Sequence, residues 1–131
     1  MVFRNQFWFL SNMYPHTIHV NGIEYTCIEA AFQSFKLEDR EARRQFSGIN
    51  GFEAKKLGRH VQLRPDWNEI KVEVMYRLLK IKFKGELGAK LKSVDGHIVE
   101  ENTWGDTFWG ICRGHGQNQL GILLERVRSE L

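Results

Sequence analysis

The pair Asn21-Gly22 constrains the fold of this chain more tightly than any other local feature. It separates residues 17–20 from residues 23–26, two segments in which polar and apolar side chains alternate. Asn-Gly readily adopts the positive φ angles of a two-residue turn, and alternation with a period of two is typical of strands. The sequence therefore predicts a β-hairpin over residues 17–26.

The segment after this hairpin has the spacing of a helix. Apolar side chains recur at helical intervals over residues 27–37, and Thr26 precedes Glu29 by three positions. A threonine followed three residues later by a glutamate matches a capping box, in which both side chains bind free backbone N–H groups at a helix start. We therefore predict a helix over residues 27–37 with Thr26 as its cap.

The longest predicted helix begins in the segment RPDWNE, residues 64–69, where Asp66 takes the N-cap position and Glu69 follows three residues later. Its apolar face comprises Trp67, Ile70, Val74, Leu78 and Ile81, and it runs to about residue 83. Shorter helices are predicted at 38–44, 52–57 and 86–92, a strand at 97–100, and a last helix after Asn118. Together these elements predict a compact, mostly helical α+β fold with a short β-hairpin and few strands.

Length and composition limit the class of protein. A chain of 131 residues suits one compact domain, so we expect residues 1–131 to form a single domain. Hydrophobic residues make up 42% and charged residues 27%, as in folded and not in disordered chains. No apolar run approaches the roughly 20 residues that span a bilayer, and the first residues lack the zones of a signal peptide. We expect a cytoplasmic protein that does not associate with membranes.

The sequence predicts no metal site and no cofactor. Cys27 and Cys112 are far apart, and the five histidines follow no zinc-ligand spacing. The glycine-rich residues 110–118 match neither a phosphate-binding P-loop nor a dinucleotide motif. The net charge of +3 is compatible with an anionic ligand but does not identify one.

Three polar residues share one stripe of the helix predicted after the hairpin. Successive helix residues rotate by roughly 100°, so Glu29, Gln33 and Lys36 lie in a row beside the apolar face. Such a row at the edge of a core could form the wall of a cleft. In the alternative interpretation Glu29 completes the capping box, Lys36 is solvated and Gln33 has no special role.

A second group lies between the predicted strand and the glycine-rich loop. Glu101, Asp106 and Trp109 suit a pocket that stacks a planar ring and binds sugar hydroxyls. Alternatively, the aromatic residues belong to the core and Asp106 is a turn residue. The free N–H groups at the start of the last helix could receive a phosphate, or Asn118 could simply cap that helix.

Several separated motifs, taken in order, resemble the NADAR family, whose members include YbiA-like N-glycosidases and ADP-ribose glycohydrolases. The motifs are FLSNMYP (9–15), EAAFQSFK (29–36), AKKLGR (54–59), LRPDWNEIKVEVM (63–75), VEENTWGDTFWG (99–110) and GQNQLGILLERVR (116–128). The resemblance covers nearly the whole chain. One departure is Glu29-Ala30, where many members of the family have Glu-His.

The resemblance implies an enzyme that hydrolyses the bond between ribose C1 and an exocyclic amine nitrogen. The implied substrate carries a phosphorylated ribosyl or an ADP-ribosyl group. It is either a phosphoribosylamino-pyrimidine intermediate of riboflavin synthesis or ADP-ribosyl-guanine, with nucleic acid as the carrier. A binding module for ADP-ribose or nucleotides that does not catalyse a reaction is the alternative. A nucleic-acid-binding role for Lys55, Lys56, Arg59 and the lysines at 80–84 is a third.

The same resemblance assigns residues to roles. Glu29 is the expected acid and base, and Lys36 is the expected nucleophile of a Schiff-base mechanism, provided that burial keeps its amine partly neutral. In a mechanism without a Schiff base, Glu29 activates water while Asp106 stabilises the positive charge on the sugar. The residues expected to bind the substrate are Phe9, Asn12, Gln33, Arg64, Trp67, Glu101, Trp109, Gly110 and Asn118.

Overall fold

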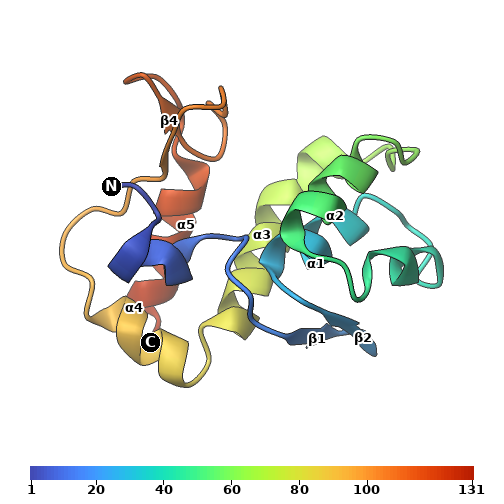
Figure 1. Ribbon diagram of the computed structural model, residues 1–131, viewed down its shortest axis with the longest axis horizontal. Helices are drawn as coiled ribbons and strands as arrows, with labels where there is room; N and C mark the ends of the chain where they lie inside the picture. Colours follow the sequence, from blue (N-terminus) through green and yellow to red (C-terminus); the bar gives the residue numbers. More distant parts are fainter. The chain divides into compact units, whose positions relative to one another are not determined.

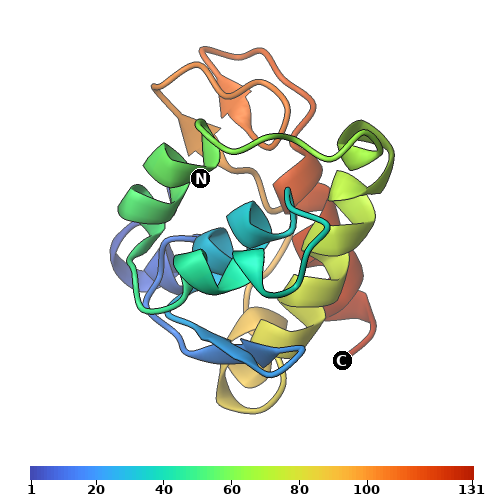
Figure 2. The same cartoon turned by 90° about the vertical axis from the view of Figure 1, so that its right-hand side faces the viewer.

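The computed structural model describes residues 1–131, and their contacts define two compact units (Figures 1 and 2). One unit comprises Asn12–Lys82, and the other comprises Met1–Ser11 together with Phe83–Leu131. Helices dominate both units, and the strands form two separate two-stranded sheets. The predicted α+β class, mostly helical with few strands, is confirmed. No helix is both long enough and apolar enough to cross a membrane.

The predicted hairpin is present in the unit of residues 12–82. Strands β1 (Ile18–Val20) and β2 (Ile23–Tyr25) pair in antiparallel fashion, and Ile18 lies opposite Tyr25. Both turn residues have positive φ angles, 53° at Asn21 and 78° at Gly22, as a two-residue turn requires. Alternation also places the side chains as expected, because Ile18, Ile23 and Tyr25 are buried while His19 and Glu24 are exposed.

Helix α1 (Ile28–Ser34) follows the hairpin, and all seven of its residues are buried. The predicted capping box is absent, because the Thr26 hydroxyl donates to the Ile49 carbonyl at 2.5 Å and Cys27 occupies the N-cap position. A contact with a residue 23 positions away has replaced the local cap. The helix is also shorter than the predicted 27–37.

Helix α2 (Gly51–Gly58) packs closely against α1 (Figure 1). Its buried face consists of Gly51, Ala54 and Gly58, three small residues at helical spacing. A Cβ atom at Gly58 would overlap the side chain of Gln33, so the backbones could not approach this closely with a larger residue. The helix starts with a complete capping box between Asn50 and Glu53.

The longest helix is α3 (Trp67–Lys82), as predicted, and it packs against α1 on the side where the Phe32 and Trp67 rings lie 5.0 Å apart. A short 3-10 helix, η2 (Ala42–Phe46), stands where an α-helix at 38–44 was predicted.

The buried face of α3 differs from the predicted one and includes a lysine. Met75, Leu78 and Leu79 are buried, whereas Ile81 is 37% exposed. Lys82 continues the stripe of Met75 by seven residues, and its side chain is fully buried with Nζ 5.5 Å from the centre of the Tyr14 ring. Burial lowers the pKa of Lys82 to about 7. This lysine therefore cannot belong to a solvated nucleic-acid-binding surface.

The other unit contains the 3-10 helix η1 (Asn5–Leu10), α4 (Glu86–Lys92) and α5 (Gln119–Ser129). Strands β3 (Glu101–Asn102) and β4 (Ile111–Cys112) pair in parallel. The predicted strand at 97–100 is wrong in position. The amide of Asn118 donates to the Ile98 carbonyl and accepts from the Glu100 N–H, both at 2.9 Å, so a side chain takes the place of a pairing strand there.

Replacing Lys82 with methionine is expected to stabilise the protein near pH 7. In the unfolded chain this amine keeps its ordinary pKa of 10.5, so folding favours loss of its proton and stability rises with pH between about 7 and 10.5. An apolar side chain of similar size removes that cost, which is of order 1–4 kcal/mol for buried charged groups. Denaturant unfolding at pH 7 and pH 10 should show a gain for Lys82→Met that shrinks at the higher pH. The exposed Lys80→Met is the control, and an equal gain at both pH values would contradict the expectation.

Candidate functional site

The polar row of α1 is buried. Glu29 is 9% exposed and Gln33 is 6% exposed, and Gln33 Nε2 donates to Glu29 Oε1 at 2.9 Å. The interpretation in which Glu29 serves a capping box is wrong, because Cys27 is the N-cap of α1 and no side-chain hydrogen bond caps this helix. The Glu29 backbone N–H instead donates to the Asn12 carbonyl at 3.0 Å. The carboxylate is held by a neighbour on its own helix.

Lys36 lies in the turn just after α1 and not within the helix. Helix α1 ends at Ser34, whose hydroxyl donates to the Ala31 carbonyl at 2.6 Å and competes with the helical pattern. Beyond it, the Arg64 N–H donates to the Lys36 carbonyl at 2.9 Å, and Arg43 Nε donates to the Leu37 carbonyl at 2.9 Å. These two arginines fix the backbone on which Lys36 is carried.

The Lys36 amine is half-buried against the end of α2, where Nζ donates to the Gly58 carbonyl at 3.3 Å. Burial is the largest influence and lowers the pKa of Lys36. The Glu29 carboxylate opposes this change, while the Arg59 guanidinium adds to it. A lowered pKa raises the fraction of neutral amine near pH 7, which is the form that attacks a carbon centre.

Asn12, Arg64 and Trp67 also belong to this unit, and each is engaged in packing or backbone contacts. Arg64 forms a bidentate ion pair with Asp66, with N···O distances of 2.6 and 3.2 Å. Trp67 is only 5% exposed and packs on Phe32. Asn12 Oδ1 is buried and accepts no hydrogen bond. Contact of these three residues with a substrate stays a prediction.

The turn that carries Asp106 is organised by its own carboxylate. Asp106 Oδ1 accepts from the N–H groups of Phe108 at 3.1 Å and Trp109 at 2.9 Å. Asn102, buried at 7% exposure, accepts from the Asp106 N–H and donates to its carbonyl. Oδ1 therefore stabilises the turn, as the interpretation of Asp106 as a turn residue predicts. The other carboxylate oxygen, Oδ2, makes no hydrogen bond within the chain.

Three further residues of this unit that were expected to bind the substrate make structural contacts within the chain: Glu101, Gly110 and Asn118. Glu101 is exposed and pairs with the Met1 amine at 3.2 Å. At Gly110 an added Cβ would overlap the Glu100 backbone and side chain, so only glycine fits beside β3. Asn118 adopts a left-handed backbone without capping α5, because its amide binds the 98–100 segment. Their roles in substrate binding also stay predictions.

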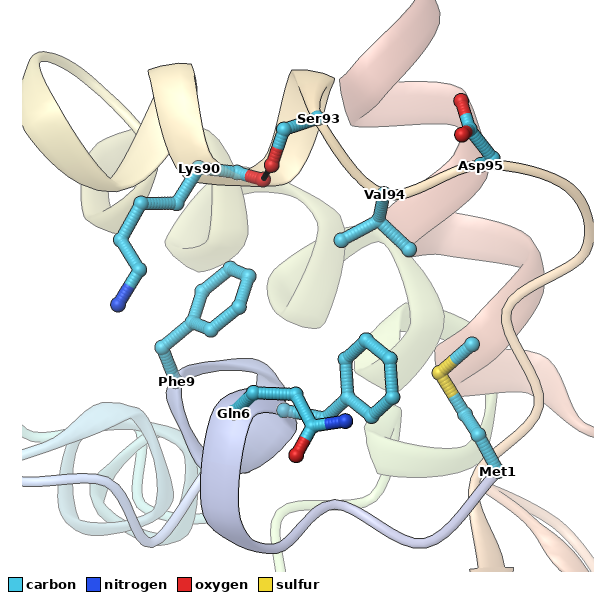
Figure 3. Close-up of a pocket in the computed structure, with 8 residues that line it drawn as sticks. Met1, Gln6, Phe9, Lys90, Ser93, Val94 and Asp95 are labelled. Carbon is cyan, nitrogen blue, oxygen red and sulfur yellow. Dashed lines mark hydrogen bonds between the residues drawn. The ribbon is translucent and has the colours of Figure 1, made fainter.

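Phe9 lines a hollow of about 520 Å³ in the same unit (Figure 3). The walls include Phe7 and Val94, and the rim includes Lys90 and Asp95. Lys90 Nζ lies 4.6 Å from the centre of the Phe9 ring, which is 4% exposed. A cation therefore lies against the ring of a residue that was expected to bind the substrate.

Sequence reasoning missed Arg43, Gly58 and Asn102. Arg43 is 9% exposed, and its guanidinium lies 4.4 Å from the centre of the Phe35 ring. Its burial could not be read from a segment rich in charges. Gly58 follows the helix predicted at 52–57 and had no signal beyond its place in the AKKLGR motif, and Asn102 had none beyond its place in the VEENTWGDTFWG motif. No three histidine, cysteine, aspartate or glutamate side chains gather at a geometry that could hold a metal ion.

Residues 2–131 match the NADAR domain family. This chain is a NADAR domain. It is 32% identical over 127 residues to the N-glycosidase YbiA of Escherichia coli (strain K12), covering 92% of this chain and 79% of that protein. The NMR structure of E. coli YbiA superposes with a TM-score of 0.85 at 29% identity, covering 99% of this chain and 83% of that one.

Longer relatives share the NADAR domain as one part of their length. A riboflavin biosynthesis protein of Vibrio vulnificus (strain YJ016) is 35% identical over 129 residues, covering 94% of this chain but 35% of the relative. The chloroplastic riboflavin biosynthesis protein PYRR of Zea mays is 35% identical over 142 residues, covering 92% of this chain and 23% of the relative. The chain thus spans about a third or less of these two proteins and most of YbiA.

Substitution of Arg59 is expected to raise the pKa of Lys36. The guanidinium lowers this pKa by charge repulsion, so Arg59→Gln should move it toward the ordinary lysine value. Glu29→Gln should act in the opposite direction, because the carboxylate favours the charged amine. NMR titration of isotope-labelled lysine side chains measures both shifts. Lys56→Gln, one turn away on α2 and exposed, is the matched control, and an equal shift there would refute a specific effect of Arg59.

Proposed function

We propose that this NADAR domain hydrolyses the bond between ribose C1 and an exocyclic amine nitrogen. The observation that carries the proposal is the half-buried Lys36 amine, whose pKa is lowered and which interacts electrostatically with the buried Glu29. A buried acid and a perturbed amine are the side chains that acid-base and Schiff-base chemistry use. The N-glycosidase name of a relative similar over most of its length supports the same reaction class.

The proposed reaction begins with opening of the sugar ring. The lone pair of the exocyclic nitrogen forms a C1=N bond while the bond from C1 to the ring oxygen breaks, and that oxygen takes a proton. The neutral Lys36 amine then adds to C1, and the first amine leaves with a proton. The resulting Schiff base between C1 and Lys36 is hydrolysed by water, which releases the sugar and restores the lysine.

Glu29 is the proposed carrier of protons in these steps. Ring opening needs a proton donor, and water attack on the Schiff base needs an acceptor. The hydrogen bond from Gln33 restricts the carboxylate to one orientation without supplying a charge.

The proposed substrate carries phosphate groups on its sugar. Arg59 and Lys56 are exposed at the end of α2 and form no ion pair within the chain, so they can meet an anion there. This charge suits both a phosphoribosylamino-pyrimidine and ADP-ribosyl-guanine carried by nucleic acid. A side-by-side hydrolysis assay on the two substrates at several salt concentrations separates them, because binding to nucleic acid weakens steeply with salt.

Borohydride trapping tests the Schiff-base mechanism. Reduction during turnover should attach the sugar to Lys36 as a stable amine, which peptide mass analysis detects. Lys36→Met should abolish both the adduct and turnover, whereas Lys92→Met, at an exposed lysine outside the candidate site, should retain both. The rate should rise as the pH passes through the Lys36 pKa, below the ordinary value of 10.5.

Glu29→Gln tests the proton carrier and should lower kcat by about 10²–10⁴-fold, the usual contribution of acid-base catalysis. Activity without an adduct on Lys36 would leave the mechanism in which Glu29 activates water directly. Tight binding of ADP-ribose without turnover of either substrate would identify a binding module instead.

A further inference from the structure

The orientation of the Gln33 amide is determined by its neighbours. The NH₂ group of Gln33 faces Glu29 and donates to its Oε1 at 2.9 Å. The carbonyl oxygen of the same amide must then point the other way. It is buried and accepts no hydrogen bond from any donor in the chain.

Gly58 occupies the space in front of that oxygen. A Cβ atom built on Gly58 would overlap Gln33 Oε1 and lie too close to the amide carbon. The oxygen therefore lies in the direction of an α-hydrogen of Gly58, where a weak Cα–H···O contact replaces an ordinary donor. Any larger residue would push the Gln33 amide away from α2 and disturb its bond to Glu29.

The carbonyl of the same glycine holds the Lys36 amine. Gly58 is the last residue of α2, where carbonyl groups lack a partner within the helix. Lys36 Nζ donates to this carbonyl at 3.3 Å. One glycine thus contacts the amide that orients the acid and the amine that is the proposed nucleophile.

We propose that Gly58 is a positioning residue for the reaction at Lys36 and Glu29. Its missing side chain sets the Gln33 amide toward Glu29, and its carbonyl fixes the direction of the Lys36 amine. This inference rests on the proposed function, because it assigns a role at the same site. The inference adds a residue to the proposed function: Gly58 has no side chain to act on the substrate, but it sets the geometry of Glu29 and Lys36, which are proposed to do so.

Gly51 offers a matched control at the other end of the same face of α2. A Cβ atom there would overlap the sulfur of the flexible Met13 side chain, and would lie 3.3 Å from Cys27 Sγ and 3.4 Å from the Glu29 Cβ, without touching Gln33 or Lys36. Alanine at either glycine has the same effect on helix propensity. Only the change at Gly58 disturbs Gln33 and Lys36.

The experiment compares Gly58→Ala with Gly51→Ala by kinetics and by NMR titration of Lys36. Gly58→Ala should lower kcat at least tenfold with a smaller change in KM, and should move the Lys36 pKa toward the ordinary lysine value as the amine leaves its buried position. The groups that set this pKa, Glu29 on α1 and Arg59 beyond α2, are unchanged in both variants. Gly51→Ala should change kcat less than about twofold and leave the pKa in place.

A double variant guards against a simple loss of folding. Combining Gly58→Ala with Gln33→Ala removes the overlapping amide and should restore the unfolding midpoint, while kcat stays low because nothing orients Glu29. Recovery of kcat along with stability would overturn the proposal, as would an unchanged Lys36 pKa in Gly58→Ala. If the wild type hydrolyses neither substrate, the proposed function fails, and the pKa measurement still decides whether Gly58 positions the amine.

Discussion

The close approach of α2 to α1 is the constraint on which the candidate site depends. The small residues on the buried face of α2 let the two helix backbones come together over the polar row of α1, and Gly58 is the one that faces Gln33 and Lys36. That approach buries Glu29 and Gln33 and brings a helix-terminal carbonyl to the Lys36 amine. A wider spacing would admit water, and hydration would return the pKa of Lys36 toward its ordinary value. Packing of the backbone thus controls the chemistry of the side chains.

A chain selected only for stability has no reason to bury such a row. Buried carboxylate and amide groups cost free energy unless each polar atom is paired, and Gln33 Oε1 is not. Apolar side chains at positions 29 and 33 would extend the core without that cost. Polar residues at buried positions where apolar residues would be more stable are typical of functional sites. Lys82 shows a similar conflict at the end of α3, where a fully buried amine continues an apolar stripe.

Features set by neighbours in sequence were predictable, and features set by distant partners were not. The hairpin is confirmed, and α3 begins at Trp67 as the local signals predicted, although both Asp66 carboxylate oxygens pair with Arg64. The cap at Thr26 failed because Ile49, far along the chain, takes the hydroxyl. The role of Asn118 as a cap failed in the same way, since its amide binds the backbone at 98–100. In each case the side chain forms a hydrogen bond with a backbone group distant in sequence, in place of the local helix cap.

The candidate site shows the same division. The helical period correctly placed Glu29 and Gln33 on one stripe, since that relation is local. It could not show that α1 ends before Lys36, because the arginines that hold the following turn come from elsewhere in the unit. The helical period also could not show that position 58 requires glycine, because that requirement comes from Gln33 on another helix.

The balance of influences on Lys36 bears on the choice between the two mechanisms. If Glu29 only activated water, a charged lysine beside it would serve as a counter-ion, and the carboxylate would dominate the amine's environment and raise its pKa. Instead burial is the larger influence and Arg59 acts in the same direction, so the carboxylate is outweighed. Donation of a proton by Glu29 during ring opening would leave the carboxylate charged, so the neutral amine that the proposed nucleophile needs depends on burial and on Arg59.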